Sequence, residues 1–164
     1  WFAKNGENYL SQGKFAAALN ELEKLDSEGE KNPLYWCNYG TALLGVERTE
    51  EAIEALERAL QLARVPGGES RIVPRDMLRL YSTLGQAQLQ AGDLERAEHF
   101  MQRALQMAPN MVQVVLNMAL IYNYQGRLDE AIAFLQNTTS AKDHPQISPL
   151  LDELLRQRLK KIEQ

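Results

Sequence analysis

The sequence predicts an all-α fold, an array of four helical hairpins closed at its C-terminal end by a single amphipathic helix. Three observations lead to this prediction. Ala, Leu, Glu, Gln and Arg, which favour helix, dominate the composition. Small residues recur at fixed intervals along the chain, and apolar residues recur at helical spacing near its end. The length of 164 residues fits one domain, which we predict to span 1–164.

Small residues mark the same position in each of the four predicted hairpins. The first set, separated by 34, 45 and 34 residues, consists of Gly6, Gly40, Gly85 and Ala119. A second set follows 12 residues later in every unit and consists of Ala18, Ala52, Ala97 and Ala131. Because Gly and Ala let two helix backbones approach closely, we interpret both sets as packing positions.

A third repeated position marks the turn inside each hairpin. It is occupied by Gly13, Glu47, Gly92 and Gly126. The glycines suit a left-handed residue that ends the first helix of a pair, and Thr49 is predicted to cap the helix that follows Glu47. The helix pairs are therefore predicted over 1–12 with 14–28, 32–46 with 49–64, 74–91 with 94–108, and 111–125 with 128–138.

The third unit shows the full pattern most clearly. Its residues are Tyr81, Leu84, Gly85, Gly92, Leu94, Ala97, Met101, Ala104, Leu105 and Pro109. This pattern resembles the tetratricopeptide repeat. The chain departs from the usual motif at Asn5, Gln88 and Thr138. The resemblance implies a right-handed superhelical stack with repeats over about 1–31, 32–66, 74–109 and 110–143.

An insertion separates the second and third units. The interval there is 45 residues instead of 34, and the excess of 11 lies within about 64–75. Because the segment contains Pro66, Gly67 and Gly68, we predict a loop, mobile over 65–71, that ends where Pro74 begins the next helix. Neither a preceding strand nor a following Lys-Ser/Thr pair supports a phosphate-binding loop.

The C-terminal segment, about 146–163, is predicted to form an amphipathic helix. Its apolar residues are Ile147, Leu150, Leu151, Leu154, Leu155, Leu159 and Ile162. Because the last repeat of such an array has an open apolar face, we predict that this helix caps Leu128, Ile132 and Leu135. The alternative is that it docks onto a partner or onto a second copy of the chain.

Charge and cysteine content exclude several classes of function. A formal net charge of −4 and a pI near 5.3 make nucleic acid an unsuitable partner. The single Cys37 allows no internal disulfide. The apolar stretch 111–124 is too short and too polar to insert into a membrane. The compartment is left open, with the cytoplasm slightly favoured, because an N-terminal segment before Trp1 could be missing.

Catalytic, metal-binding and cofactor-binding residues are not predicted. The candidates His99, His144 and Cys37 do not converge by spacing, because the first and second helices of such hairpins line opposite walls of the stack. The acidic residues around Glu47–Glu57 are spread along a helix surface, whereas a metal site needs ligands from several elements. The sequence therefore gives no sign of an enzyme.

The family resemblance implies that a partner lies along an inner, concave wall built chiefly from the first helices. Aligning the repeats places twelve candidate contact residues there: Leu10, Asn38, Thr41, Leu44, Arg79, Ser82, Gln86, Leu89, Leu116, Leu120, Asn123 and Tyr124. The leucines shared by successive units either contact the ligand or seal neighbouring helices. The function predicted first is an adaptor that binds a segment of a protein or peptide partner, and the second is a self-assembling scaffold.

One subfamily of these repeats binds acidic C-terminal tails through Lys, Arg and Asn at fixed inward positions. The corresponding residues here are Ala3, Glu7, Asn38, Arg79 and Thr83. Only Asn38 and Arg79 match, and Glu7 adds a negative charge. Capture of a terminal carboxylate is therefore disfavoured.

Overall fold

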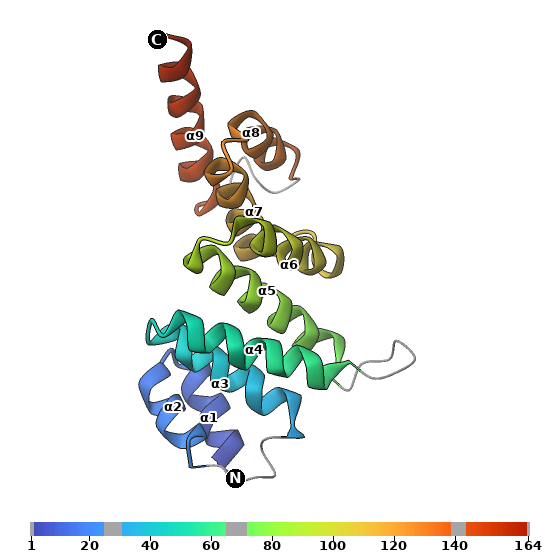
Figure 1. Ribbon diagram of the computed structural model, residues 1–164. Coiled ribbons are helices and arrows are strands. Elements are labelled where there is room, and N and C mark those ends of the chain that lie inside the picture. Colours follow the sequence, from blue (N-terminus) through green and yellow to red (C-terminus); the bar gives the residue numbers. More distant parts are fainter. Residues whose placement is uncertain (1, 25–30, 65–71, 139–143, 164) are drawn as a thin grey trace.

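The computed structural model describes residues 2–24, 31–64, 72–138 and 144–163. These ranges contain nine helices and no strand: α1 (Phe2–Ser11), α2 (Phe15–Leu22), α3 (Pro33–Gly45), α4 (Thr49–Ala63), α5 (Pro74–Ala91), α6 (Leu94–Met107), α7 (Val112–Tyr124), α8 (Leu128–Asn137) and α9 (Ile147–Ile162). Figure 1 shows an elongated stack with the two chain ends at opposite ends of the molecule.

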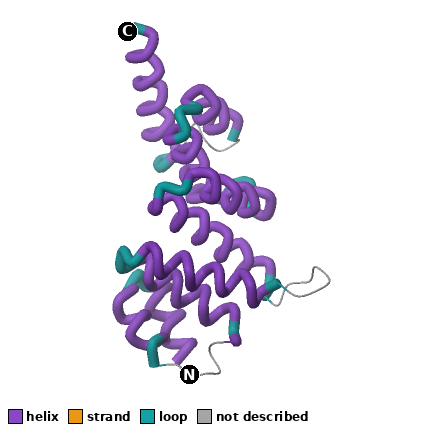
Figure 2. Tube along the Cα trace, viewed as in Figure 1, coloured by secondary structure: helices purple, strands orange, loops and turns teal. Residues whose placement is uncertain are grey.

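Each hairpin packs on the preceding one in the same way. Helices α1–α2, α3–α4, α5–α6 and α7–α8 pair as hairpins across short turns, which Figure 2 shows in teal. The first helix of each later hairpin also packs against both helices of the hairpin before it. Helix α9 contacts α8 and α7 in the same way. Every hairpin therefore covers the apolar face of its predecessor, as expected for a repeat array.

The small repeated residues lie where the two helices of a hairpin cross. A Cβ atom added to Gly6 would be 3.0 Å from Leu22, and one added to Gly40 would be 2.5 Å from Leu56. Ala119, the fourth member of the set, has no exposed surface. The predicted packing role of these positions is confirmed.

The turn position adopts the same conformation in all four hairpins. Gly13, Gly92 and Gly126 have φ of 68°, 82° and 79°. Glu47 has φ of 64° and is the only residue other than glycine with positive φ in the described ranges. A side chain in this left-handed region costs energy that glycine does not pay.

The apolar core ends on α9. Ile147, Leu151 and Leu154 of this helix are buried and belong to one cluster with Leu128, Ile132 and Leu135 of α8. Each such side chain contributes about 2 kcal/mol when it is removed from water. The predicted capping contact is thus present.

Most helix limits agree with the prediction to within one or two residues, and Pro74 opens α5 as expected. Two predictions at helix ends were wrong. Thr49 is not a capping residue, because α4 begins at Thr49 itself and Arg48 precedes it. Helix α2 ends at Leu22 instead of Glu28. The exposed Glu23 and Lys24 add nothing to its buried face, and such burial supplies most helical stability. The segment predicted to be mobile, 65–71, lies outside the described residues.

Candidate functional site

The first helices form one continuous layer, and this layer is the inner wall of the stack. Helices α1, α3, α5, α7 and α9 contact one another in sequence. The second helices α2, α4, α6 and α8 make no comparable contacts among themselves in the described part of the chain. Because the closely spaced layer is the shorter side of a curved stack, the first helices line the concave side.

The structure places all twelve predicted contact residues on these first helices, but with different exposure. Tyr124 is 62% exposed. Partly exposed side chains are those of Leu10, Thr41, Arg79, Ser82, Gln86, Leu89, Leu116, Leu120 and Asn123. Asn38 and Leu44, in contrast, are buried, with 1% and 8% of their surface exposed. Asn38 therefore packs inside the wall, whereas Leu44 keeps a small exposed surface and lines the cavity described below.

Several polar residues of α1, α3 and α5 contact one another on this wall. The Nδ2 atom of Asn38 donates to Oε1 of Glu7 at 3.3 Å and thereby links α3 to α1. Arg79 lies 3.5 Å from the carboxylate of Asp76. Burial raises the pKa of Cys37, although the neighbouring Arg79 partly opposes this shift. The thiol is therefore protonated at neutral pH and unsuited to nucleophilic chemistry.

A cavity of about 220 Å³ opens between α3 and α5. Its lining consists of Phe15, Thr41, Leu44, Gly45, Thr83 and Gln86. Three of these residues were among the predicted contacts, whereas Phe15, Gly45 and Thr83 were not. A Cβ atom at Gly45 would overlap the ring of Phe15, so the glycine lets the start of α2 close one side of the cavity. The sequence signal that could have pointed to this contact is Gly45, a glycine in the last turn of α3.

The exposed apolar part of the wall lies on α7. Leu10, Leu89 and Leu116 pack against the core clusters with part of their surface. Leu120 and Tyr124 belong to none of these clusters. Among the apolar residues predicted as contacts, Leu120 and Tyr124 are thus the ones that pack against none of the core clusters.

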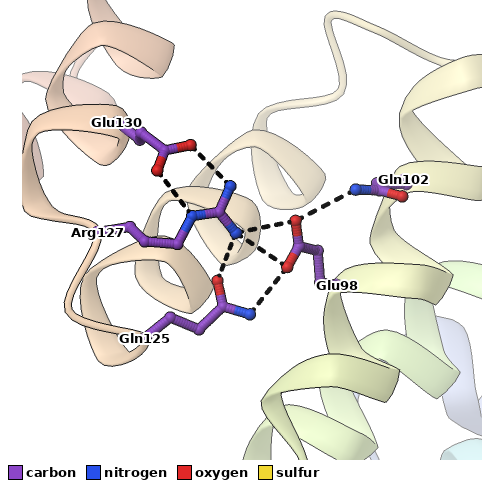
Figure 3. Close-up of polar contacts among 5 residues, drawn as sticks. All are labelled: Glu98, Gln102, Gln125, Arg127 and Glu130. Carbon is purple, nitrogen blue, oxygen red and sulfur yellow. Dashed lines mark hydrogen bonds and ion pairs between the residues drawn. The ribbon is translucent and has the colours of Figure 1, made fainter.

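The outer side carries a polar network that joins the third and fourth hairpins. Figure 3 shows Arg127 between Glu98 of α6 and Glu130 of α8, with Nη1 3.1 Å from Glu98 and Nη2 2.7 Å from Glu130. Its guanidinium also lies 4.3 Å from the ring centroid of Tyr122. Arg127 lowers the pKa of Glu130. Because the charged groups satisfy one another, we interpret the network as a structural clamp.

A larger cavity, of about 660 Å³, lies between the outer helices α4 and α6. An ion pair between Glu57 and Arg96 spans these helices, and His99 lines the cavity beside Phe100. The described residues contain no group of three or more His, Cys, Asp or Glu side chains that could hold a metal ion. Among the same residues, no helix combines the length and apolar character needed to cross a membrane.

Comparison with solved structures finds the same fold. A chain of the APC/C hetero-tetramer Cut9-Hcn1 matches with a TM-score of 0.81 and 20% identity, over 94% of this chain and 29% of that chain. This chain therefore spans less than a third of that protein. Two MamA structures match with TM-scores of 0.76 and 0.63, at 17% and 20% identity. Each match covers 99% of this chain, and 87% and 80% of the MamA chains.

Comparison with curated proteins found no match. Two family models described as tetratricopeptide repeat match residues 33–110 and 77–154. The two matches together cover three of the four hairpins and reach the first half of α9. Such repeats are typically non-catalytic and serve as scaffolds for protein interaction. The chain belongs to the tetratricopeptide repeat family.

Proposed function

We propose that the chain binds an extended, largely uncharged segment of a partner protein along the inner wall formed by α1, α3, α5 and α7. The observation that carries this proposal is the cavity between α3 and α5, on the same wall as the exposed Tyr124 of α7. A cavity for a side chain and an exposed aromatic residue are the features that anchor a partner in a binding site.

The charge of the wall supports an uncharged segment. The charged side chains described on it are few, and Arg79 is already paired with Asp76. Asn38, which would have to donate to a terminal carboxylate, donates to Glu7 instead. The remaining surface presents hydroxyl, carboxamide and apolar groups, which suit the backbone and neutral side chains of an extended chain.

The proposal is tested by capturing partners with the purified protein and measuring their affinity for wall variants. Leu120→Glu and Tyr124→Ala should each weaken binding by about tenfold, because both side chains are accessible and neither belongs to the core. Met107→Glu is the matched control, since Met107 is 40% exposed on the outer helix α6. Equal loss in all three variants, or no loss in the two wall variants, would refute binding along the wall.

Self-assembly is a second candidate, and the distal part of α9 favours it. Leu159 and Ile162 are 59% and 75% exposed there, and Figure 1 shows this part of α9 projecting from the stack. The helix is acidic at Asp152 and Glu153 and basic at Lys160 and Lys161. Two copies packed antiparallel would pair opposite charges around an apolar stripe.

Light scattering over a range of concentrations separates the two candidates. Self-assembly predicts a mass that rises with concentration and returns to that of a monomer in the variant with Leu159→Glu and Ile162→Glu. A monomer at all concentrations would rule out this use of α9 and leave partner binding as the function of the chain.

A further inference from the structure

The cavity between α3 and α5 has a polarity that specifies what it can bind. Thr41 donates its hydroxyl proton to the backbone carbonyl of Cys37 at 2.7 Å, and Thr83 donates to that of Arg79 at 2.8 Å. A carbonyl oxygen can only accept, and a hydroxyl has one proton to give. Both threonine oxygens are therefore left with lone pairs only. The group that meets them must be a hydrogen-bond donor.

Gln86 can supply a hydrogen-bond donor to the same cavity. It lines the same cavity, and its carboxamide makes no hydrogen bond to another side chain or to the backbone in the described part of the chain. It is partly exposed and can turn its NH₂ group toward a ligand. The cavity can therefore offer two acceptors from the threonines and one donor from Gln86.

The size of the cavity and the charges near it limit which chemical groups it can bind. A volume of about 220 Å³ leaves room for one side chain of moderate size. Phe15 and Leu44 supply apolar surface for a methylene stem. The negative charge of Glu7 lies beside Asn38, which precedes Thr41 by about one helical turn on α3, whereas Asp76 and Arg79 compensate each other. A carboxylate is disfavoured by this charge, and an ammonium group by the apolar surroundings.

We propose that this cavity binds a carboxamide side chain, Asn or Gln, of the partner segment. The two N–H protons of the carboxamide go to the oxygens of Thr41 and Thr83, its oxygen accepts from Gln86, and its stem packs against Phe15 and Leu44. This inference rests on the proposed binding along the inner wall and adds the specificity of one position within it.

A small-molecule titration tests the cavity without knowledge of the partner. Propionamide and propionate have nearly the same shape and differ in the group presented. Followed by NMR, propionamide at millimolar concentration should shift the methyl signals of Thr41 and Thr83 and the side-chain NH₂ signal of Gln86. Propionate should bind at least tenfold more weakly. Equal affinity of the two compounds, or no shift of these signals with propionamide, would overturn the proposal.

Variants test the assigned acceptors and donor. The double variant Thr41→Val and Thr83→Val keeps the branched shape but removes both acceptors, and should weaken propionamide binding by about tenfold or more. If its melting curve shows that it does not fold, Gln86→Met is the alternative, because Gln86 is partly exposed and its replacement spares the core. Undiminished propionamide binding by a folded variant would contradict the assignment.

The same NMR signals distinguish failure of this inference from failure of the proposed function. A captured partner that shifts the signals of Leu120 and Tyr124 but not those of Thr41, Thr83 and Gln86 would leave binding along the wall intact and refute the carboxamide site. A partner that shifts only signals of the outer helices would refute binding along the wall, whatever propionamide does.

Discussion

The close approach of α3 and α4 at Gly40 gives the sharpest test of how the repeat is packed. The change Gly40→Ala would place a Cβ atom 2.5 Å from Cγ of Leu56 and 3.1 Å from the backbone oxygen of Ala52. Carbon atoms in contact prefer at least about 3.5 Å, so Leu56 would have to retreat by about 1 Å. Leu56 has no exposed surface, and the oxygen of Ala52 can move only if α4 moves.

The expected magnitude follows from two opposing effects. Alanine is about 1 kcal/mol better than glycine in a helix interior, whereas forcing an extra methyl group into a packed core costs about 1 to 3 kcal/mol. The net loss should be about 1 kcal/mol, which lowers the melting temperature of a domain of this size by about 2 to 4 °C. Gly85→Ala is the matched comparison, because the three atoms nearest to its new Cβ all belong to the unbranched side chain of Met101, at 2.8 to 3.1 Å, and none is a backbone atom. Met101 is buried as well, so we expect this variant to lose stability, but less than Gly40→Ala.

Chemical denaturation of a double-mutant cycle provides the assay. Leu56→Ala alone should cost about 2 to 5 kcal/mol because it leaves a cavity. In that background the methyl group of Gly40→Ala has space, so the same substitution should become neutral or stabilising. Additive effects of Gly40→Ala and Leu56→Ala, or a Gly40→Ala variant as stable as Gly85→Ala, would refute the close approach as the reason for glycine here.

Four further measurements follow from the structure. Glu47→Gly should raise the free energy of unfolding by about 1 kcal/mol, because Glu47 alone among the described non-glycine residues has positive φ; an unchanged denaturation midpoint would count against strain. Deletion of 145–164 should cause aggregation or early melting, because it uncovers Leu128, Ile132 and Leu135. Light scattering and calorimetry measure these two effects, and a truncated chain that stays monomeric and fully stable would contradict the capping role of α9. Leu44→Glu should lower the melting temperature far more than Leu120→Glu, since Leu44 is buried, and equal losses would contradict that assignment. The pKa of Glu130 is lowered by Arg127, so the stabilising pair is present above the ordinary carboxyl value of 4.5 and is lost as pH falls through the lowered pKa. The stability difference between the wild type and Arg127→Met should therefore shrink on acidification, and a difference independent of pH would exclude this pair as its source.

The sequence predicts the helices and their pairing well because the relevant signals are local and repeated. A glycine at the turn position and a small residue at the crossing position are required in every unit by the same backbone geometry. Gly13, Gly92 and Gly126 consequently adopt the predicted left-handed conformation. Glu47 adopts the same left-handed conformation, although its side chain disfavours it, because the turn between the two helices of the hairpin requires that conformation at this position.

The surface of the candidate site was less predictable because exposure depends on contacts between repeats. Leu44 and Leu89 share one position in the motif, yet Leu44 is buried and Leu89 is partly exposed. Asn38 matches a tail-binding residue by alignment, but Glu7 of the preceding hairpin engages it. The cavity beside Thr41 depends on Phe15, which comes from another hairpin and no spacing rule relates to it. Such contacts arise only when the hairpins are assembled.

Contacts between neighbouring helices also determine which substitutions can distinguish partner binding from self-assembly. The proposed partner wall includes α7, self-assembly is proposed for α9, and the two proposed sites share no residue. These two helices nevertheless pack against each other, so a substitution on one can shift the other. Leu120 and Tyr124 lie outside the core clusters, and Leu159 and Ile162 are exposed, which makes these side chains the ones whose replacement disturbs that packing least. A Leu120→Glu variant that keeps its melting temperature and its mass but loses the partner would therefore assign binding to the inner wall. A variant that changes all three properties would report only on the packing of α7 against α9.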